Sequence, residues 1–198
     1  LSRQPRVDAD KVWFVRLGMG AASPGEATAG AAYGFGFRYE LDSIGVEVSF
    51  LDFVQLANDQ NDGWTGSFVK IMGLRYTDPL ANASPYFGGG VSWGGQNYTV
   101  GDDRYEGHGV QLELRAGYEM LRASTIRLFL QADAGLPIYT ADRTSYDWGI
   151  YSDGSGETEF AEDSNWMPTL TFSLGVGFGG GNRHRGHRDG FRPVRVGH

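Results

Sequence analysis

The chain contains no cysteine, which excludes disulfide bonds, thiolate metal sites and catalysis by a thiol nucleophile. It has no uncharged apolar run near the roughly 18 residues that a membrane-spanning helix needs, so no transmembrane helix is predicted. It has no excess of basic charge, and its net charge of -7 argues against a general nucleic-acid binder. Proline is scarce at 7 residues, while the 31 glycines are dispersed, which excludes a linker and a collagen repeat.

The sequence does contain a repeated alternation of apolar residues with small or polar residues. The clearest example runs from Val110 to Met120, and the last is TLTFSLGVGF at Thr169 to Phe178. Eight such segments are present, and no convincing helical period is found. They span approximately residues 12–19, 31–41, 44–50, 67–76, 85–93, 110–120, 126–135 and 169–178. The chain is therefore predicted to be all-β, and the even number of segments favours a closed, antiparallel up-and-down barrel.

The lengths of the connections alternate as well. The second, fourth and sixth segments are followed by short turns at 42–43, roughly 77–84 and roughly 121–124, whereas the other connections are longer, the last being roughly 137–168. Short turns at one end and long loops at the other are typical of outer-membrane barrels. We therefore expect a transmembrane barrel over residues 11–178, an N-terminal segment over 1–10 and a basic tail over 179–198.

The polar faces of the segments favour a membrane barrel over a soluble, lipocalin-like barrel that would turn its apolar face inward around a ligand. Their charges are mostly Arg and are set among Gly and Ser, a mixture that suits the narrow interior of eight strands. We expect a polar, charge-paired lumen, because isolated buried charges are costly. Its predicted members are Arg16, Arg38, Glu40, Glu47, Arg75, Glu113, Arg115, Glu119, Arg127 and Asp133.

The turn at residues 42–43 makes the strand register testable. A two-residue hairpin there pairs Leu41 with Ile44 and sets Arg38 directly opposite Glu47, a contact worth about 0.2–1 kcal/mol or more where water is scarce. A second register, with Glu119 opposite Arg127, would bring Asp133 level with Glu113 and diagonal to Arg115.

The fourth segment, about Ser67 to Tyr76, is the least regular. Its bulky residues are assigned to the apolar face, which also places Lys70 on that face and Arg75 on the polar face. The assigned apolar residues are Phe68, Met72, Leu74 and Tyr76.

Aromatic residues of the apolar faces gather near the two ends of the segments, with aliphatic residues between them. Two such belts are typical of the two interfaces of a membrane. The belt at the short-turn end is predicted to hold Trp13, Tyr39, Tyr76, Phe87, Tyr118 and Phe178, and the belt at the long-loop end to hold Tyr33, Trp64, Trp93 and Trp166.

The alternating segments, the run SPYFGGGVSW at Ser84 to Trp93 and the terminal LTFSLGVGF resemble the small eight-stranded outer-membrane barrels of the OmpA/OmpX type, over roughly Lys11 to Phe178. The resemblance implies a bacterial outer-membrane location with periplasmic termini. The implied partners are outer-membrane lipid, lipopolysaccharide and the barrel-assembly machinery, which reads a last strand ending in Phe. The chain begins at Leu1 rather than Met, which would fit removal of a signal peptide.

The chain departs from that family at its end, because twenty residues follow Phe178. They carry five Arg against the single acid Asp189, a net charge of about +4. This tail would meet anionic headgroups, peptidoglycan or a periplasmic partner, or it would be a disordered extension without specific binding. In the acidic last loop, Asp153, Glu157 and Glu159 form a weak candidate for a Ca²⁺ site, although a solvated loop is the simpler interpretation. No cofactor is expected.

Three hypotheses about function remain open from the sequence. The leading one is a non-enzymatic outer-membrane barrel with a role in envelope structure or surface interaction through its loops. The alternatives are a narrow channel for ions or small solutes and the soluble ligand-binding barrel. A barrel that modifies lipid A would need a His near a Ser and a carboxylate; His108 and Ser92 lie near the same end, but no motif supports such an enzyme.

Overall fold

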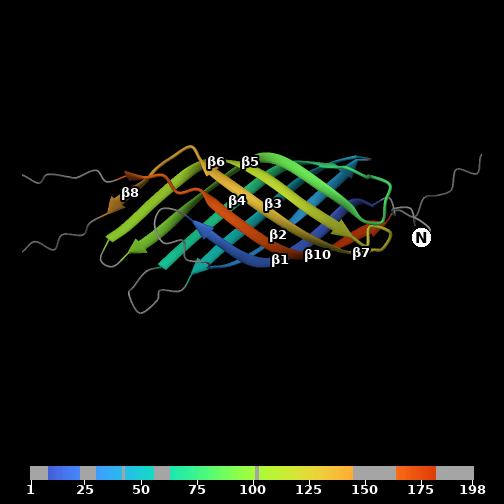
Figure 1. Cartoon of the computed structure of the whole chain (residues 1–198), viewed down its shortest axis with the longest axis horizontal. Coiled ribbons are helices and arrows are strands. Elements are labelled where there is room, and N and C mark those ends of the chain that lie inside the picture. Colours follow the sequence, from blue (N-terminus) through green and yellow to red (C-terminus); the bar gives the residue numbers. More distant parts are fainter. Residues whose placement is uncertain are drawn as a thin grey trace, which may run out of the picture.

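The computed structural model describes residues 9–22, 30–41, 43–55, 63–100, 103–144 and 164–181. These residues form strands and turns, and none of them belongs to a helix long and apolar enough to cross a membrane. Eight long strands close into one antiparallel barrel, and two short strands extend it at one end (Figure 1).

The eight barrel strands are β1 (Ala9–Ala22), β2 (Gly30–Leu41), β3 (Ile44–Gln55), β4 (Gly63–Tyr76), β5 (Ser84–Val100), β6 (Asp103–Met120), β7 (Ile126–Pro137) and β10 (Thr169–Gly181). Each pairs with its neighbour in the chain, and β10 closes the barrel against β1. The short strand β8 (Ala141–Thr144) pairs with β6, and the short strand β9 (Ser164–Asn165) pairs with β8. The predicted eight-stranded up-and-down barrel is confirmed.

The apolar side chains of the strands face outward and the polar side chains face inward, the reverse of the arrangement in a water-soluble protein. In β10, Leu174 is 56% exposed on the outer wall, whereas the neighbouring Ser173 is 3% exposed inside the barrel. The same alternation runs through β2, where Phe35 is exposed and Arg38 is buried. This arrangement is the opposite of what a lipocalin-like barrel requires, because that barrel would hide its apolar face around a ligand.

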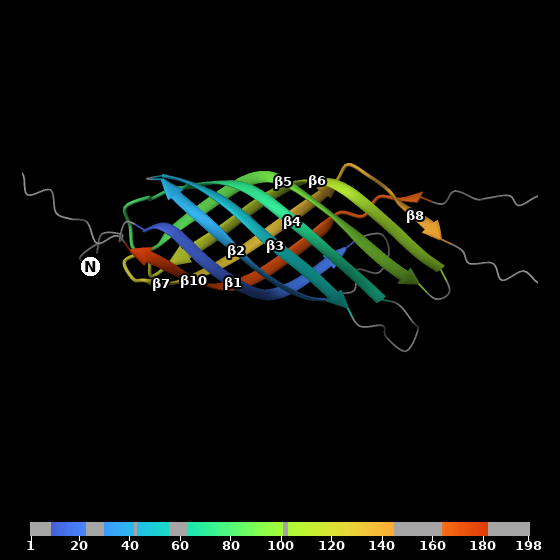
Figure 2. The same cartoon turned by 180° about the vertical axis from the view of Figure 1, so that it is seen from behind.

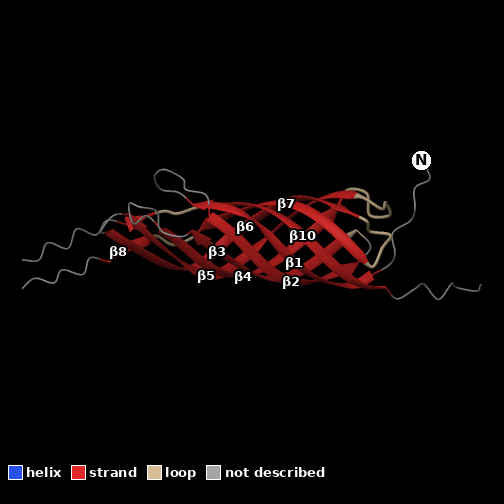
Figure 3. Ribbon diagram, turned by 90° about the horizontal axis from the view of Figure 1, so that it is seen from below, coloured by secondary structure: helices blue, strands red, loops and turns tan. Residues whose placement is uncertain are grey.

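The turns at one end agree with the sequence, but those at the other end differ in one respect. Leu41 pairs with Ile44, as the two-residue hairpin predicts. At the opposite end, however, β5 and β6 remain paired as far as Val100 and Asp103, so the predicted long loop after the fifth segment is mostly strand. Figure 2 shows this β5–β6 hairpin projecting at the end where β8 lies. The two ends are called the short-turn end and the long-loop end below (Figure 3).

The terminal strands extend beyond the expected limits of 11 and 178. Ala9 of β1 pairs with Gly181 of β10, so the two strands begin and end together at the short-turn end. Residues 1–8 and 182–198, which include most of the basic tail, lie outside the described residues.

Inward-facing glycines create the space that bulky lumen side chains need. A Cβ atom added to Gly175 would lie 2.0 Å from two ring carbons of Phe129. One added to Gly117 would lie 2.4 Å from the ring of Tyr86. Small residues therefore stand on the inner face at these positions because rings from other strands occupy the lumen beside them. The interior of an eight-stranded barrel has little room for more side chains.

Gly175→Ala should destabilise the barrel by about 1–3 kcal/mol, because the new methyl group overpacks against Phe129. The matched control is Gly73→Ala on the outer wall, where the nearest atom to an added Cβ is the carbonyl oxygen of Gly89 at 3.7 Å. Unfolding in urea, followed by tryptophan fluorescence in detergent micelles, measures both. Adding Phe129→Leu should rescue Gly175→Ala; equal stability of the two alanine variants would contradict this account of the lumen.

Candidate functional site

The lumen holds a concentration of buried charge, and it is the candidate site. Among the described residues, six cations and five anions are buried inside the barrel: Arg16, Arg38, Lys70, Arg115, Arg122 and Arg127 with Glu40, Glu47, Glu113, Glu119 and Asp133. These side chains come from six of the eight barrel strands, all but β5 and β10, and from one turn. The predicted charge-paired lumen is therefore confirmed, although its membership differs from the sequence prediction at three positions: Arg75 is absent, and Lys70 and Arg122 are present.

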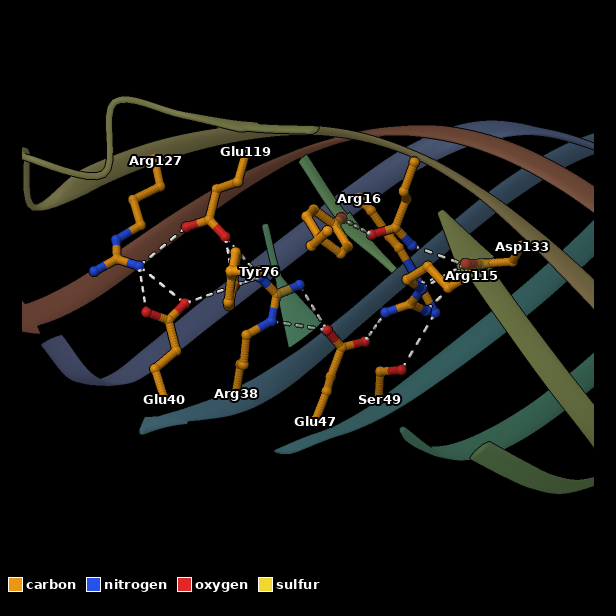
Figure 4. A network of polar contacts seen from close by, with 12 residues as sticks. Arg16, Arg38, Glu40, Glu47, Ser49, Tyr76, Arg115, Glu119, Arg127 and Asp133 are labelled. Carbon is orange, nitrogen blue, oxygen red and sulfur yellow. Dashed lines mark hydrogen bonds and ion pairs between the residues drawn. The ribbon is translucent and has the colours of Figure 1, made fainter. Parts of the chain in front are cut away.

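One cluster lies toward the short-turn end of the lumen (Figure 4). The Arg127 guanidinium donates to both oxygens of Glu40 at 3.0 and 2.9 Å and to Glu119 at 3.0 Å. Arg38 donates to Glu119 at 2.9 Å and to the Tyr76 hydroxyl at 2.9 Å. That hydroxyl lies 2.9 Å from Glu40 and 2.7 Å from Glu119, so its single proton can serve either carboxylate. Both carboxylates are thus held by cations and by one phenol.

A second cluster continues the network toward the middle of the barrel (Figure 4). Arg38 donates to Glu47 at 2.8 Å, and Arg115 donates to the other oxygen of the same carboxylate. Arg115 also forks onto Asp133, to which Arg16 donates at 3.3 Å. Each of the two acids is therefore shared by two guanidinium groups, and the fork geometry of Arg makes this bridging possible.

The strand register explains which pairs are direct. Arg38 is opposite Glu47, as predicted from the hairpin. The second predicted register is wrong, because Arg115 rather than Glu113 is opposite Asp133. Met120 pairs with Leu128, so the β6–β7 connection encloses two more residues than that register assumed. Glu119 and Arg127 still meet at 3.0 Å, but diagonally.

The fourth strand turns the other way from the prediction. Lys70 is buried inside the barrel and donates to Glu113 at 2.7 Å, while Arg75 is exposed on the outer wall between Ile44 and Phe87. Trp64, Phe68, Met72, Leu74 and Tyr76 accordingly face inward. Both faces of β4 are apolar, since Val69 and Ile71 line its outer side, so the alternation did not distinguish them.

The charged residues of β4 held a signal that would have corrected the assignment. Lys70 lies at the middle of the strand, where a charge facing lipid would be at its most expensive. Arg75 lies next to the last residue, where its long side chain can reach a polar interface. The cost of a mid-membrane charge therefore favours Lys70 inside and Arg75 outside.

Eight of the ten predicted belt residues are exposed on the outer wall: Trp13, Tyr33, Tyr39, Phe87, Trp93, Tyr118, Trp166 and Phe178. The other two predictions were wrong, because Trp64 and Tyr76 are each 2% exposed inside the barrel. Both belong to β4, so the reversed assignment of that strand accounts for both errors.

An apolar cluster, the lumen cap, fills the long-loop end of the barrel. Phe53 stacks on Trp64 with ring centroids 4.9 Å apart and meets Phe68 edge-on at 6.0 Å. The lumen cap consists of Ala32, Leu51, Phe53, Trp64, Phe68, Ala141 and Met167. Ala141 belongs to β8, and Met167 lies in the segment between β9 and β10. The cap therefore depends on these two parts of the chain as well as on the long strands.

Arg122 closes the lumen at the short-turn end. It lies in the β6–β7 turn, is fully buried, and sits 4.0 Å above the ring of Tyr76. Its Nη1 donates to the carbonyl oxygens of Asp78 and Pro79 at 3.2 Å, which ties the β4–β5 turn across the mouth of the barrel. The sequence pattern missed this residue because a turn carries no alternation to indicate which way a side chain points.

The other candidate residues do not assemble into a site. Ser92 is buried in the lumen and donates to Glu113 at 2.7 Å, whereas His108 is exposed on the outer wall, so the two lie on opposite sides of the sheet. Asp153, Glu157 and Glu159 lie outside the described residues, as does the tail from residue 182. Within the part of the chain that the structure describes, no three metal-ligating side chains are grouped.

No protein-family model matches the chain, and no curated protein sequence matches it. Solved structures do. Neisserial surface protein A (NspA) aligns with a TM-score of 0.63 and 11% identity, covering 86% of this chain and 97% of that one. Ail of Yersinia pestis aligns with a TM-score of 0.55 and 11% identity, covering 86% of this chain and 98% of that one. The N-terminal β-barrel domain of Pseudomonas aeruginosa OprF aligns with a TM-score of 0.53 and 13% identity, covering 88% of this chain and 98% of that one. The chain has the fold of the small eight-stranded outer-membrane barrels.

Lys70→Met should destabilise the barrel by roughly 3–5 kcal/mol, because it leaves the buried Glu113 carboxylate without its cation. The matched control Arg75→Met should change stability by less than about 1 kcal/mol, since Arg75 lies on the outer wall. Urea unfolding in lipid vesicles measures both. Adding Glu113→Gln to Lys70→Met should recover most of the loss. A larger cost for Arg75→Met than for Lys70→Met would contradict the orientation of β4.

Proposed function

We propose that this protein is a bacterial outer-membrane barrel that does not conduct solutes and that acts through its surface, in envelope structure or in interactions at its long-loop end. The observation that carries the proposal is the filled lumen. Its buried charges are paired with one another from the short-turn end to the middle, and the lumen cap closes the long-loop end. The surfaces left for contact are the outer wall, the loops and the tail.

The outer wall supports the membrane location. Its middle is a continuous band of exposed aliphatic side chains, including Leu17, Val48, Leu114 and Leu130, with aromatic residues toward both ends. A water-soluble monomer rarely exposes so large an apolar surface, whereas a lipid bilayer requires one. Outer-membrane lipid and lipopolysaccharide are accordingly the proposed partners of this wall.

The unequal ends support an orientation. In outer-membrane barrels the short turns are periplasmic, so the short-turn end, where β1 begins and β10 finishes, is assigned to the periplasm. Both termini are then periplasmic, and the basic tail would meet a periplasmic partner. The alternation of β10 around Phe172, Leu174 and Phe178 is the surface that the barrel-assembly machinery would recognise.

The lumen argues against the alternative of a narrow channel. A conducting path would need water between the side chains, but Glu47 and Asp133 each contact two guanidinium groups directly. Moving one of these side chains aside would leave a charge unpaired in a confined space, which is strongly unfavourable. A catalytic role is not proposed, since His108 and Ser92 lie on opposite sides of the wall.

The purified protein should show no steady conductance in a planar lipid bilayer. Arg38→Ala removes the cation shared by Glu47 and Glu119 and should produce brief, irregular channel openings. Arg75→Ala, on the outer wall, should produce no current across the bilayer. Steady conductance of the wild-type protein that Arg38→Ala or Glu119→Ala alters would contradict the non-conducting barrel and favour the channel.

The membrane location predicts that the protein needs detergent to remain monodisperse and that unheated samples migrate faster than boiled ones on a denaturing gel. The physical reason is that a closed barrel resists unfolding by detergent at room temperature, because each of the eight barrel strands is paired on both sides. Size-exclusion chromatography with and without detergent provides the second measurement. A monodisperse species without detergent would instead favour a soluble barrel.

A further inference from the structure

A groove of about 420 Å³ crosses the outer wall from β2 to β6 near the long-loop end. Its lining includes the outward-facing side chains of Tyr33, Asp52, Thr65, Ser67, Asn97 and Glu106. None of these six takes part in the lumen charge network, although Phe53 of the lumen cap also lines the groove.

The strand register explains why the wall is hollow here. Asp52 pairs with Ser67, Ser67 with Gly95, and Gly95 with His108, so one row of outward positions crosses four strands. Gly95 has no side chain, and it leaves a gap in that row between Ser67 and His108. The next row toward the loops runs through Thr65 and Asn97.

The chemistry of the lining favours a ligand rich in hydroxyl groups. The Ser67 hydroxyl donates to Asp52, and Thr65 and Asn97 supply an uncharged hydroxyl and an amide that can both donate and accept. The two carboxylates disfavour a phosphate, and the groove lining contains no Lys or Arg to attract one. Glu106 is already paired with Arg104 at 2.6 Å. The Asp52 carboxylate accepts from Ser67 and can also accept from the hydroxyl groups of a ligand.

The height of the groove on the wall indicates where its ligand comes from. Two residues along β5 from Gly95, toward the middle of the barrel, Trp93 is 64% exposed and marks the edge of the apolar band. Its partners Val69 and Val110 are exposed as well. The groove therefore begins where the apolar surface stops, at the level where lipid headgroups meet acyl chains.

We infer that this groove binds the uncharged sugar headgroup of a glycolipid in the leaflet that surrounds the long-loop end. The acyl chains would lie on the apolar band below Trp93 while the sugar hydroxyls bond to Thr65, Ser67 and Asn97. The inference rests on the proposed membrane location and adds to it a ligand class and a site.

The test uses the full chain in phosphatidylcholine nanodiscs, with backbone amide shifts of Ser67, Gly95 and His108 as the readout. Titration with a dihexosyl diacylglycerol should shift these amides to saturation, whereas diacylglycerol with the same acyl chains should not. Thr65→Val combined with Asn97→Leu should weaken binding by about tenfold, the loss expected for two hydrogen bonds. The matched control Thr125→Val, exposed at the short-turn end, should leave binding unchanged.

Three results would overturn the inference by showing a different occupant of the groove. Equal shifts with diacylglycerol would mean that only acyl chains contact the wall. Equal shifts with the free disaccharide at the same concentration would mean that the ligand is a soluble sugar. Shifts with phosphatidylglycerol and Mg²⁺ that EDTA abolishes would mean that a bridged anion occupies the groove. If the protein enters nanodiscs but its amides do not shift, glycolipid binding in the groove is refuted and the membrane location stands. If the protein does not enter nanodiscs, the membrane location itself is refuted.

Discussion

The structure depends on one constraint: charges inside a closed barrel of eight strands must find their partners within the lumen. Water cannot fill a space that side chains already occupy, and an unpaired buried charge costs more than a small protein can offset. Glu47 therefore lies between Arg38 and Arg115, and Asp133 between Arg115 and Arg16. The same constraint explains the inward glycines, since Gly175 makes room for the ring of Phe129.

The lumen is closed by different means at its two ends, and both bear on function. Apolar rings stack around Trp64 at the long-loop end, whereas Arg122 binds turn carbonyls at the short-turn end. An aromatic closure needs no charge partners and excludes water by packing. With both ends filled, the remaining surface is the outside: an exposed apolar band, which we propose meets acyl chains, and at the edge of that band a polar groove beside Gly95.

The sequence predicted the barrel and much of its lumen because period-two alternation is a local property. Wherever one face of a strand was plainly apolar, as at Leu112 and Leu174, the sidedness followed correctly. Where both faces carried apolar residues, in β4, it did not, and the whole strand was turned the wrong way: Lys70 and Arg75, and with them Trp64, Phe68, Met72, Leu74 and Tyr76. A penalty for a charge at mid-strand would have corrected all of these assignments together.

The order of the strands, the antiparallel closure and the inward direction of Arg38, Glu47, Arg115 and Asp133 follow from the sequence by itself, because each is set by alternation and turn length. Only the tertiary structure decided which cation meets which anion. That choice depends on the tilt of the strands and on the two extra residues in the β6–β7 connection, which slide Arg115 rather than Glu113 opposite Asp133. It also decided the lumen cap, because Ala141 and Met167 meet the residues of β2 to β4 only once the barrel has closed. The groove depends on the registers of the successive strands β2 to β6, which align its outward side chains.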